Sequence, residues 1–178
     1  MKKSMLLMFL VTVLASGCSG SAEDSNSDNG TATGALESAA QTCTALNGRA
    51  DVRCTPGAFN PSVTQATINS TICVSGWTAT VRPPSSYTTG LKDQQKPEYG
   101  EANVSDSNLE EDHLVPLELG GAPRDPNNLW PEPRASISSA GQGAETKDSE
   151  ENSLKKQVCT GQITLATARQ KILADWTH

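Results

Sequence analysis

Aromatic residues are scarce in this chain and make up only 4% of its 178 residues. Because aromatic side chains bury large apolar areas, this scarcity predicts a modest hydrophobic core. Basic residues are also in the minority, with 14 Lys and Arg against 20 Asp and Glu. An acidic surface does not attract nucleic acid by counterion release, and no basic stripe runs through the sequence. The composition therefore argues against a tight DNA-binding protein.

Long apolar runs are missing too, apart from one near the N-terminus. Residues 5–14 are mostly apolar, but this run is too short to cross a bilayer as a helix. Lys2 and Lys3 precede it and small residues follow it, which is the order of a secretory signal peptide. The sequence therefore predicts that residues 1–17 are removed on export.

The end of this segment, from Leu14 to Cys18, resembles the lipobox of bacterial lipoproteins. The resemblance implies cleavage before Cys18 and attachment of lipid to that cysteine, and two or three acyl chains would anchor the protein stably. Ser19 is not the aspartate that retains such proteins at an inner membrane. We therefore expect a lipid-anchored, extracytoplasmic protein, on the periplasmic face of an outer membrane or at the cell surface. The alternative is an ordinary secretory signal with a chance cysteine.

The segment after the cleavage site has the composition of a linker. Residues 18–40 are rich in Ser, Gly, Asn and Asp and show no apolar period, which predicts a flexible tether. Residues 41–178 are enough for one domain and too few for two. Without Lys2 and Lys3 the mature chain would hold 12 basic and 20 acidic residues, a formal net charge of −8.

The remaining cysteines are four in number, which in an exported chain predicts two disulfides with three possible connectivities. We favour Cys43–Cys54, which closes a short loop, and Cys73–Cys159, which joins the early and late parts of the domain. The longer closure should stabilise the fold by ~4 kcal/mol. A structural metal site is disfavoured because no pair has the C-x-x-C spacing.

Local patterns predict a mixed α+β fold with helices near the C-terminus. Residues 66–81 are dense in Thr, Ile and Val, which favours one or two short strands. Residues 85–100 can form a helix that ends near Pro97. A second helix is expected over 147–159, and Thr164 should cap a third over 165–176.

The stretch from Glu111 to Pro133 predicts a hairpin. Residues 114–119 form an apolar segment in which Pro116 allows only an edge or irregular strand. Gly120 and Gly121 allow a sharp reversal, and a second strand should begin at Leu129. A helix can follow the Ser- and Gly-rich residues 138–143. Strand, loop, strand and helix follow one another in the order of a ββα finger.

The motif Asp-His-x-x-Pro-Leu-x-Leu-Gly-Gly, beginning at Asp112 and followed by Asn128-Leu129, resembles the HNH branch of the ββα-metal nucleases, also called His-Me finger nucleases. It also resembles a group of small exported bacterial proteins that carry the same hairpin and are sometimes described as HNH-like. The nuclease resemblance covers residues 111–158.

The resemblance implies a role for three residues. Asp112 would bind Mg²⁺ or another divalent metal, which takes oxygen ligands. His113 would be the general base that deprotonates the attacking water, because imidazole titrates near neutral pH. Asn128 would hydrogen-bond across the hairpin and hold the histidine loop in place. Nucleic acid is the substrate that this family implies, although the net charge does not support it.

The sequence departs from the family where a third metal ligand is expected, because residues 137–141 supply none. Asp148 is the candidate replacement, with Glu151 or Asn152 as alternatives on the next helix. Lys147, just before Asp148, looks like part of a solvated helix start. Two functions stay open: a metal-dependent phosphodiesterase, and a non-catalytic envelope lipoprotein in which Asp112 and His113 merely form a hydrogen-bonded pair at a hairpin end.

Overall fold

The computed structural model describes residues 42–138 and 140–177. The predicted signal peptide (1–17), the lipidation site Cys18 and the predicted tether (18–40) lie outside the described residues. Within the described part, no helix is both long and apolar enough to span a membrane.

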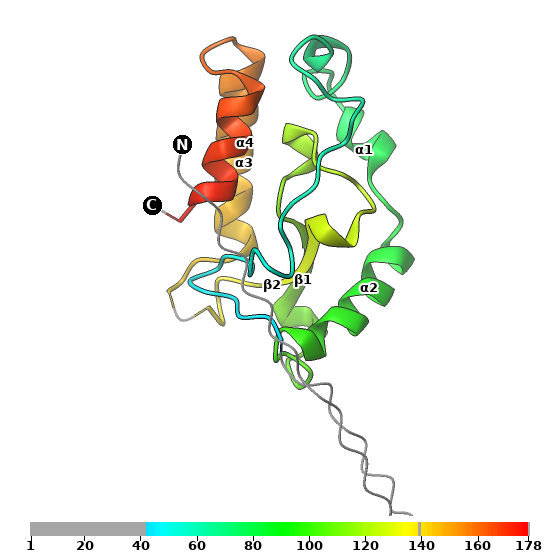
Figure 1. Cartoon of the computed structure of the whole chain (residues 1–178), viewed down its shortest axis with the longest axis vertical. Coiled ribbons are helices and arrows are strands. Elements are labelled where there is room, and N and C mark those ends of the chain that lie inside the picture. The colour runs from blue at the N-terminus through cyan, green and yellow to red at the C-terminus, as the bar shows by residue number, and fades with distance from the viewer. Residues whose placement is uncertain (1–41, 139, 178) are drawn as a thin grey trace, which may run out of the picture. The chain divides into compact units, whose positions relative to one another are not determined.

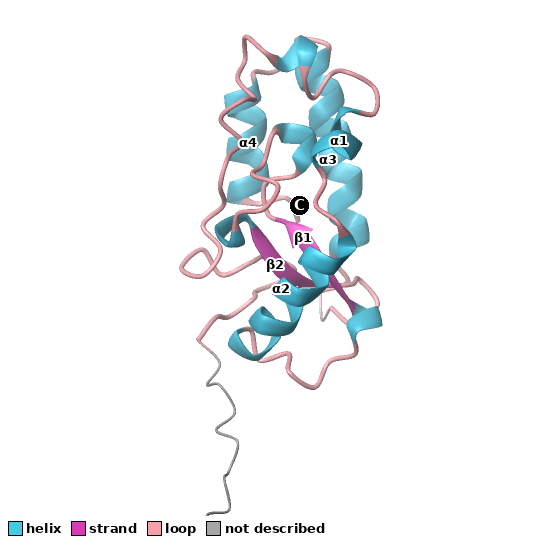
Figure 2. Cartoon of the chain, turned by 90° about the vertical axis from the view of Figure 1, so that its right-hand side faces the viewer, coloured by secondary structure: helices cyan, strands magenta, loops and turns pink. Residues whose placement is uncertain are grey.

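The described part of the chain has the mixed α+β architecture that the sequence predicts. A two-stranded antiparallel hairpin pairs Asp112 with Trp130. Its strands and the α-helices are β1 (Leu109–His113), β2 (Leu129–Pro133), α1 (Trp77–Val81), α2 (Ser85–Glu98), α3 (Ala144–Cys159) and α4 (Leu165–Ala174). Short 3₁₀ helices span Ile68–Ser70, Asp106–Asn108, Leu117–Leu119 and Pro126–Asn128. Helices α3 and α4 pack together on one side of the hairpin, and α2 contacts both strands from the other (Figures 1 and 2).

The first strand of the hairpin lies earlier than predicted. The expected strand segment 114–119 instead contains a 3₁₀ helix at Leu117–Leu119, and β1 is the acidic run that ends at His113. Pro116 explains the difference, because it has no N–H for a strand ladder. Its carbonyl accepts the N–H groups of Leu119 and Gly121, each at 2.9 Å, and so closes a tight turn.

The strands predicted over 66–81 are also wrong. This segment holds the 3₁₀ helix Ile68–Ser70 and helix α1. Its threonines bond to nearby carbonyls instead of joining a sheet: Thr67 Oγ1 donates to Ser62 O at 2.8 Å, and Thr71 Oγ1 donates to Thr67 O at 2.7 Å. Such local bonds compete with a strand ladder, and β-propensity depends on a partner strand that this segment lacks.

The predicted helices are confirmed with small changes at their ends. Helix α2 ends one residue after Pro97, and α3 begins directly after the Ser- and Gly-rich stretch. Thr164 caps α4, since its Oγ1 accepts the N–H of Thr167 at 3.1 Å. Helix α4 ends at Ala174, two residues before the predicted end at Trp176.

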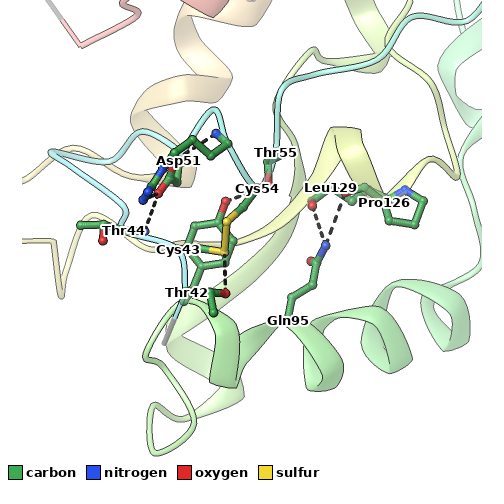
Figure 3. Close-up of a disulfide and its surroundings, with 11 residues drawn as sticks. Thr42, Cys43, Thr44, Asp51, Cys54, Thr55, Gln95, Pro126 and Leu129 are labelled. Atoms are coloured by element: carbon green, nitrogen blue, oxygen red, sulfur yellow. Dashed lines mark hydrogen bonds and ion pairs between the residues drawn. A yellow bond between two sulfur atoms is a disulfide. The ribbon is translucent and has the colours of Figure 1, made fainter. Parts of the chain in front are cut away.

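Two apolar clusters and both predicted disulfides hold these elements together. The larger cluster joins α3 and α4 to the loop after β1, and Cys73–Cys159 crosses beside it with a sequence separation of 86. The smaller one packs Trp130 against Tyr99, with ring centroids 5.5 Å apart, next to Cys43–Cys54. Figure 3 shows the Cys43–Cys54 disulfide and, in its surroundings, Gln95. Nε2 of Gln95 donates to the Leu129 carbonyl at 2.9 Å. Strand β2 is thus held by α2 and by the residue that follows it.

Candidate functional site

Asn128 fastens the loop that connects the two strands. The residue is fully buried, and both ends of its amide are used. Its Oδ1 accepts the N–H groups of Val115 at 2.9 Å and Ala58 at 3.3 Å. Its Nδ2 donates to the carbonyls of Val115 at 3.0 Å and Ala122 at 3.1 Å. These are the cross-hairpin bonds that the resemblance implies for Asn128.

The two glycines of the motif close the same loop. Gly120 has a φ of 72°, a left-handed conformation that favours glycine. At Gly121 a Cβ atom would lie 1.7 Å from the Val115 carbonyl oxygen, so no side chain fits. The turn and the Asn128 bonds together fix the position of the strand end at His113.

His113 is held in one tautomer. Its side chain is 5% exposed, and its Nε2 lies 3.1 Å from the Pro123 carbonyl oxygen. A carbonyl oxygen only accepts, so Nε2 carries the proton and the lone pair is on Nδ1. Among the described residues Nδ1 has no hydrogen-bond partner, and it is not shut off from solvent.

Electrostatics favours the neutral form of this imidazole. Burial lowers the pKa of His113 below its usual value, and the nearby Asp112 opposes that shift only in part. Near neutral pH the ring is therefore uncharged and can accept a proton on Nδ1. This arrangement is the one that a general base requires.

A polar cleft of about 430 Å³ lies between β1 and the start of α2, and His113 lines it. Glu111, two residues earlier on the same face of the strand, lines it too. Neither Glu111 oxygen has a hydrogen-bond donor among the described residues. Burial raises the pKa of Glu111 to about 8, so it is largely protonated at neutral pH.

Two arginines border this cleft and differ in their partners. Arg134 pairs with Glu110 at 3.2 Å and Glu145 at 2.9 Å. Arg82 is exposed, and in the part of the chain that the structure describes no ion pair joins it to a carboxylate. Arg82 is therefore a cation at the cleft that stays available for an anionic ligand.

A buried lysine of α3 lies against the opposite face of β1, and here the sequence interpretation was wrong. Lys147 is not part of a solvated helix start: its side chain is 1% exposed. Its ammonium donates to Asp112 Oδ2 at 2.5 Å, Glu151 Oε1 at 2.6 Å and the His113 carbonyl oxygen at 2.8 Å. All three protons of the ammonium group are thus used.

Glu132 completes this cluster from β2. It is fully buried, and neither oxygen accepts a hydrogen bond from the described residues, although its carboxyl lies against that of Asp112. Two ionised carboxylates have no proton to share, so a bond between them requires one to be protonated. Burial raises the pKa of Glu132 well above its usual range, which makes Glu132 the donor. Burial alone would also raise the pKa of Asp112, but the Lys147 charge and the Glu132 bond lower it.

The residues at Asp112 do not fit a divalent metal. The Lys147 ammonium lies against the predicted ligand, where it satisfies the carboxylate and repels a second cation. Asp148 is exposed and its side chain makes no bond to Asp112, while Asn152 donates to the Asp148 backbone carbonyl at 2.8 Å. In residues 42–138 and 140–177 no three His, Cys, Asp or Glu side chains are grouped so that they could hold a metal ion.

Sequence reasoning found the histidine and missed the lysine. Lys147, Glu151, Leu154 and Val158 are spaced as one face of a helix, and three of them are buried. That spacing was the available signal that Lys147 faces inward. Glu132 gave none, because an acidic residue next to two prolines in a short strand is not a recognisable pattern.

Comparison with known proteins adds no family to this picture. No family model, no curated protein and no solved structure matches the chain.

Proposed function

We propose that the domain is a hydrolase of phosphate esters in which His113 is the general base. The observation that carries this proposal is the fixed tautomer of His113, with a free Nδ1 lone pair at the polar cleft. The order of Asp112, His113 and Asn128 in the motif supports an HNH-like nuclease or phosphodiesterase within that class.

The reaction follows from the groups at the cleft. Nδ1 of His113 takes a proton from water as the oxygen attacks phosphorus, and the bond from phosphorus to the leaving oxygen breaks. Arg82 is placed to stabilise the negative charge that develops on the phosphoryl oxygens. The leaving oxygen takes its proton from solvent, because both carboxyl oxygens of Glu111, the acid on the same face as His113, are buried. No step is assigned to a metal, because the Asp112 cluster does not fit one.

The test is hydrolysis by purified wild-type protein and by His113→Ala, with plasmid DNA and bis(4-nitrophenyl) phosphate as substrates. Loss of the base should lower the rate about 10²–10⁴-fold. His178→Ala removes the only other histidine of the chain and is the matched control, with an unchanged rate. Equal rates for wild type and His113→Ala would place the activity elsewhere.

A second function is favoured by the cluster around Lys147. An ammonium that satisfies Asp112 and the His113 carbonyl stabilises the hairpin whether or not any reaction takes place. The chain would then be a non-catalytic envelope protein that keeps the hairpin as a scaffold. Wild-type protein without activity on either substrate, with and without Mg²⁺ or Mn²⁺, would favour this function.

We also propose that the protein works outside the cytoplasm, attached through lipid on Cys18. The two disulfides support an oxidising compartment, since such bonds rarely persist in the cytosol. Changing Cys18 to Ala should leave an unprocessed or soluble protein in membrane fractionation. An unchanged mass and an unchanged membrane fraction would refute the lipid anchor.

A further inference from the structure

The ammonium of Lys147 lies at the centre of an oxygen cage built by three elements. Strand β1 supplies the Asp112 carboxylate and the His113 carbonyl oxygen, and helix α3 supplies Glu151. Strand β2 adds Glu132, whose carboxyl borders Asp112. The three bonded oxygens lie 2.5, 2.6 and 2.8 Å from the nitrogen.

We propose that Lys147 is a built-in cation that takes the place of a divalent metal ion at Asp112, so that this site neither needs nor binds such an ion. The inference does not depend on the catalytic role of His113. It concerns what occupies the cage, and it is tested by ion binding and thermal unfolding instead of hydrolysis.

The donor pattern supports this assignment. A hard cation in a protein is held by carboxylate and carbonyl oxygens, and the oxygens around Lys147 are of these two kinds. The lysine comes from the helix that follows the hairpin, the element on which the sequence lacked a third ligand. The helix thus supplies a positive charge in place of a ligand.

The charges in the cage are also balanced without a metal ion. The Lys147 ammonium is ion-paired with the side chains of both Asp112 and Glu151. A divalent ion bound to Asp112 would stand within a few ångströms of a fixed positive charge that is 1% exposed and cannot swing into solvent.

Lys147 also acts on the proposed base without touching its ring. Its bond to the His113 carbonyl oxygen ties the end of β1 to α3, and this fixes the backbone from which the imidazole projects. Lys147 is therefore a positioning residue, as a metal ion at the same place would be.

The cage dimensions predict which ion could replace the ammonium. Mg²⁺ needs oxygens at about 2.0–2.1 Å, whereas Ca²⁺ accepts about 2.3–2.6 Å and irregular geometry. The present distances exceed the range for Mg²⁺ and reach that for Ca²⁺. Lys147→Ala, which empties the cage, should therefore gain a site that takes Ca²⁺ in preference to Mg²⁺.

The experiment is calorimetric titration of the full mature chain with Ca²⁺, Mg²⁺ and Mn²⁺, together with thermal unfolding in EDTA and in millimolar Ca²⁺. Wild-type protein should bind none of the ions and unfold at the same temperature in both buffers. Lys147→Ala should bind Ca²⁺ and unfold at a higher temperature when it is present. Lys147→Met is the matched control, since it removes the charge but fills the cage, and it should gain no site.

Two results would overturn the proposal. One is a wild-type protein that binds any of the three ions and loses that binding in Asp112→Asn. The other is a folded Lys147→Ala that binds none of them, because the cage would then be no metal position. Should Lys147→Ala fail to fold in either buffer, the wild-type titration decides: an Asp112-dependent ion overturns the proposal, and no bound ion supports it.

Discussion

The two faces of strand β1 place the same kinds of residue in opposite situations. Toward α3, Asp112 is ion-paired with the buried Lys147 and borders the buried Glu132. Toward α2, Glu111 and His113 line a polar cleft, and neither the Glu111 carboxyl nor Nδ1 of His113 has a partner among the described residues. One face is electrostatically complete and the other is not.

Under the proposed function, one short strand serves stability on one face and chemistry on the other. Successive side chains of a strand point to opposite faces, so neighbours in sequence need not share an environment. The paired acid and base of the motif, Asp112 and His113, are such neighbours. We therefore expect substitutions at Asp112 to act mainly on folding, and substitutions at the cleft to act mainly on function.

The largest effect on stability is expected on the α3 face. Asp112→Asn removes a charge that the buried Lys147 requires and should lower the free energy of unfolding by about 3–5 kcal/mol. Glu110→Gln is the matched control, because it breaks only the more exposed pair with Arg134 and should cost at most ~1 kcal/mol. Urea unfolding of both variants measures the comparison. Similar costs for the two would mean that the cluster is not a buried ionic network.

A smaller effect on stability is expected at Glu111, where the substitution should stabilise the protein. Its folded pKa of about 8 lies above the ordinary value, so the unfolded chain releases the proton first as pH rises. Wild-type stability should therefore fall between about pH 4.5 and pH 8, and Glu111→Gln should remove that part of the loss. The variant should be more stable than wild type by about 1–3 kcal/mol at pH 8 and equal to it at pH 4.

Thermal unfolding across this pH range checks the Glu111 prediction. The stability difference should grow with pH and then level off. A constant difference at all pH values would mean that the carboxyl is ionised in the folded protein and that its burial is of no consequence.

The smallest effect on stability is expected at Arg82. The side chain is exposed and makes no ion pair with the described residues, so Arg82→Gln should change stability by no more than about 0.5 kcal/mol. If the cleft binds a phosphate, the same change should raise the KM for bis(4-nitrophenyl) phosphate. An unchanged KM would remove Arg82 from the ligand site.

Much of the architecture was predictable from the sequence. The turn at Gly120 and the Thr164 cap depend on local chemistry, and the α+β class follows from local patterns. The disulfides were predicted from the even number of cysteines in an exported chain. The position of β1 could not be predicted from the sequence, because Leu-Glu-Glu-Asp-His has poor strand propensity. These acids tolerate burial in a strand because Glu111 keeps its proton and Asp112 meets Lys147, and both facts depend on tertiary contacts.

The candidate site was predictable in the same uneven way. His113 and Asn128 stood out because of the motif, and the structure brings their loop and strand together. Lys147 lies 35 residues from Asp112, and no short-range pattern indicates that an ammonium and a carboxylate so far apart are in contact. The missing metal ligand was thus noticed, but its substitute was not.

The close contact at Gly121 has a consequence for how the motif evolves. No side chain fits beside the Val115 carbonyl, and the Asn128 amide has no spare bond, so selection for folding alone keeps both residues. If the chain is the hydrolase proposed above, a lineage that loses hydrolysis would drift at His113 and Arg82 long before it drifted at Gly121 or Asn128. Under the proposed function, the glycine pair and the asparagine would report ancestry in genome surveys, and the state of the histidine would report whether hydrolysis has been retained.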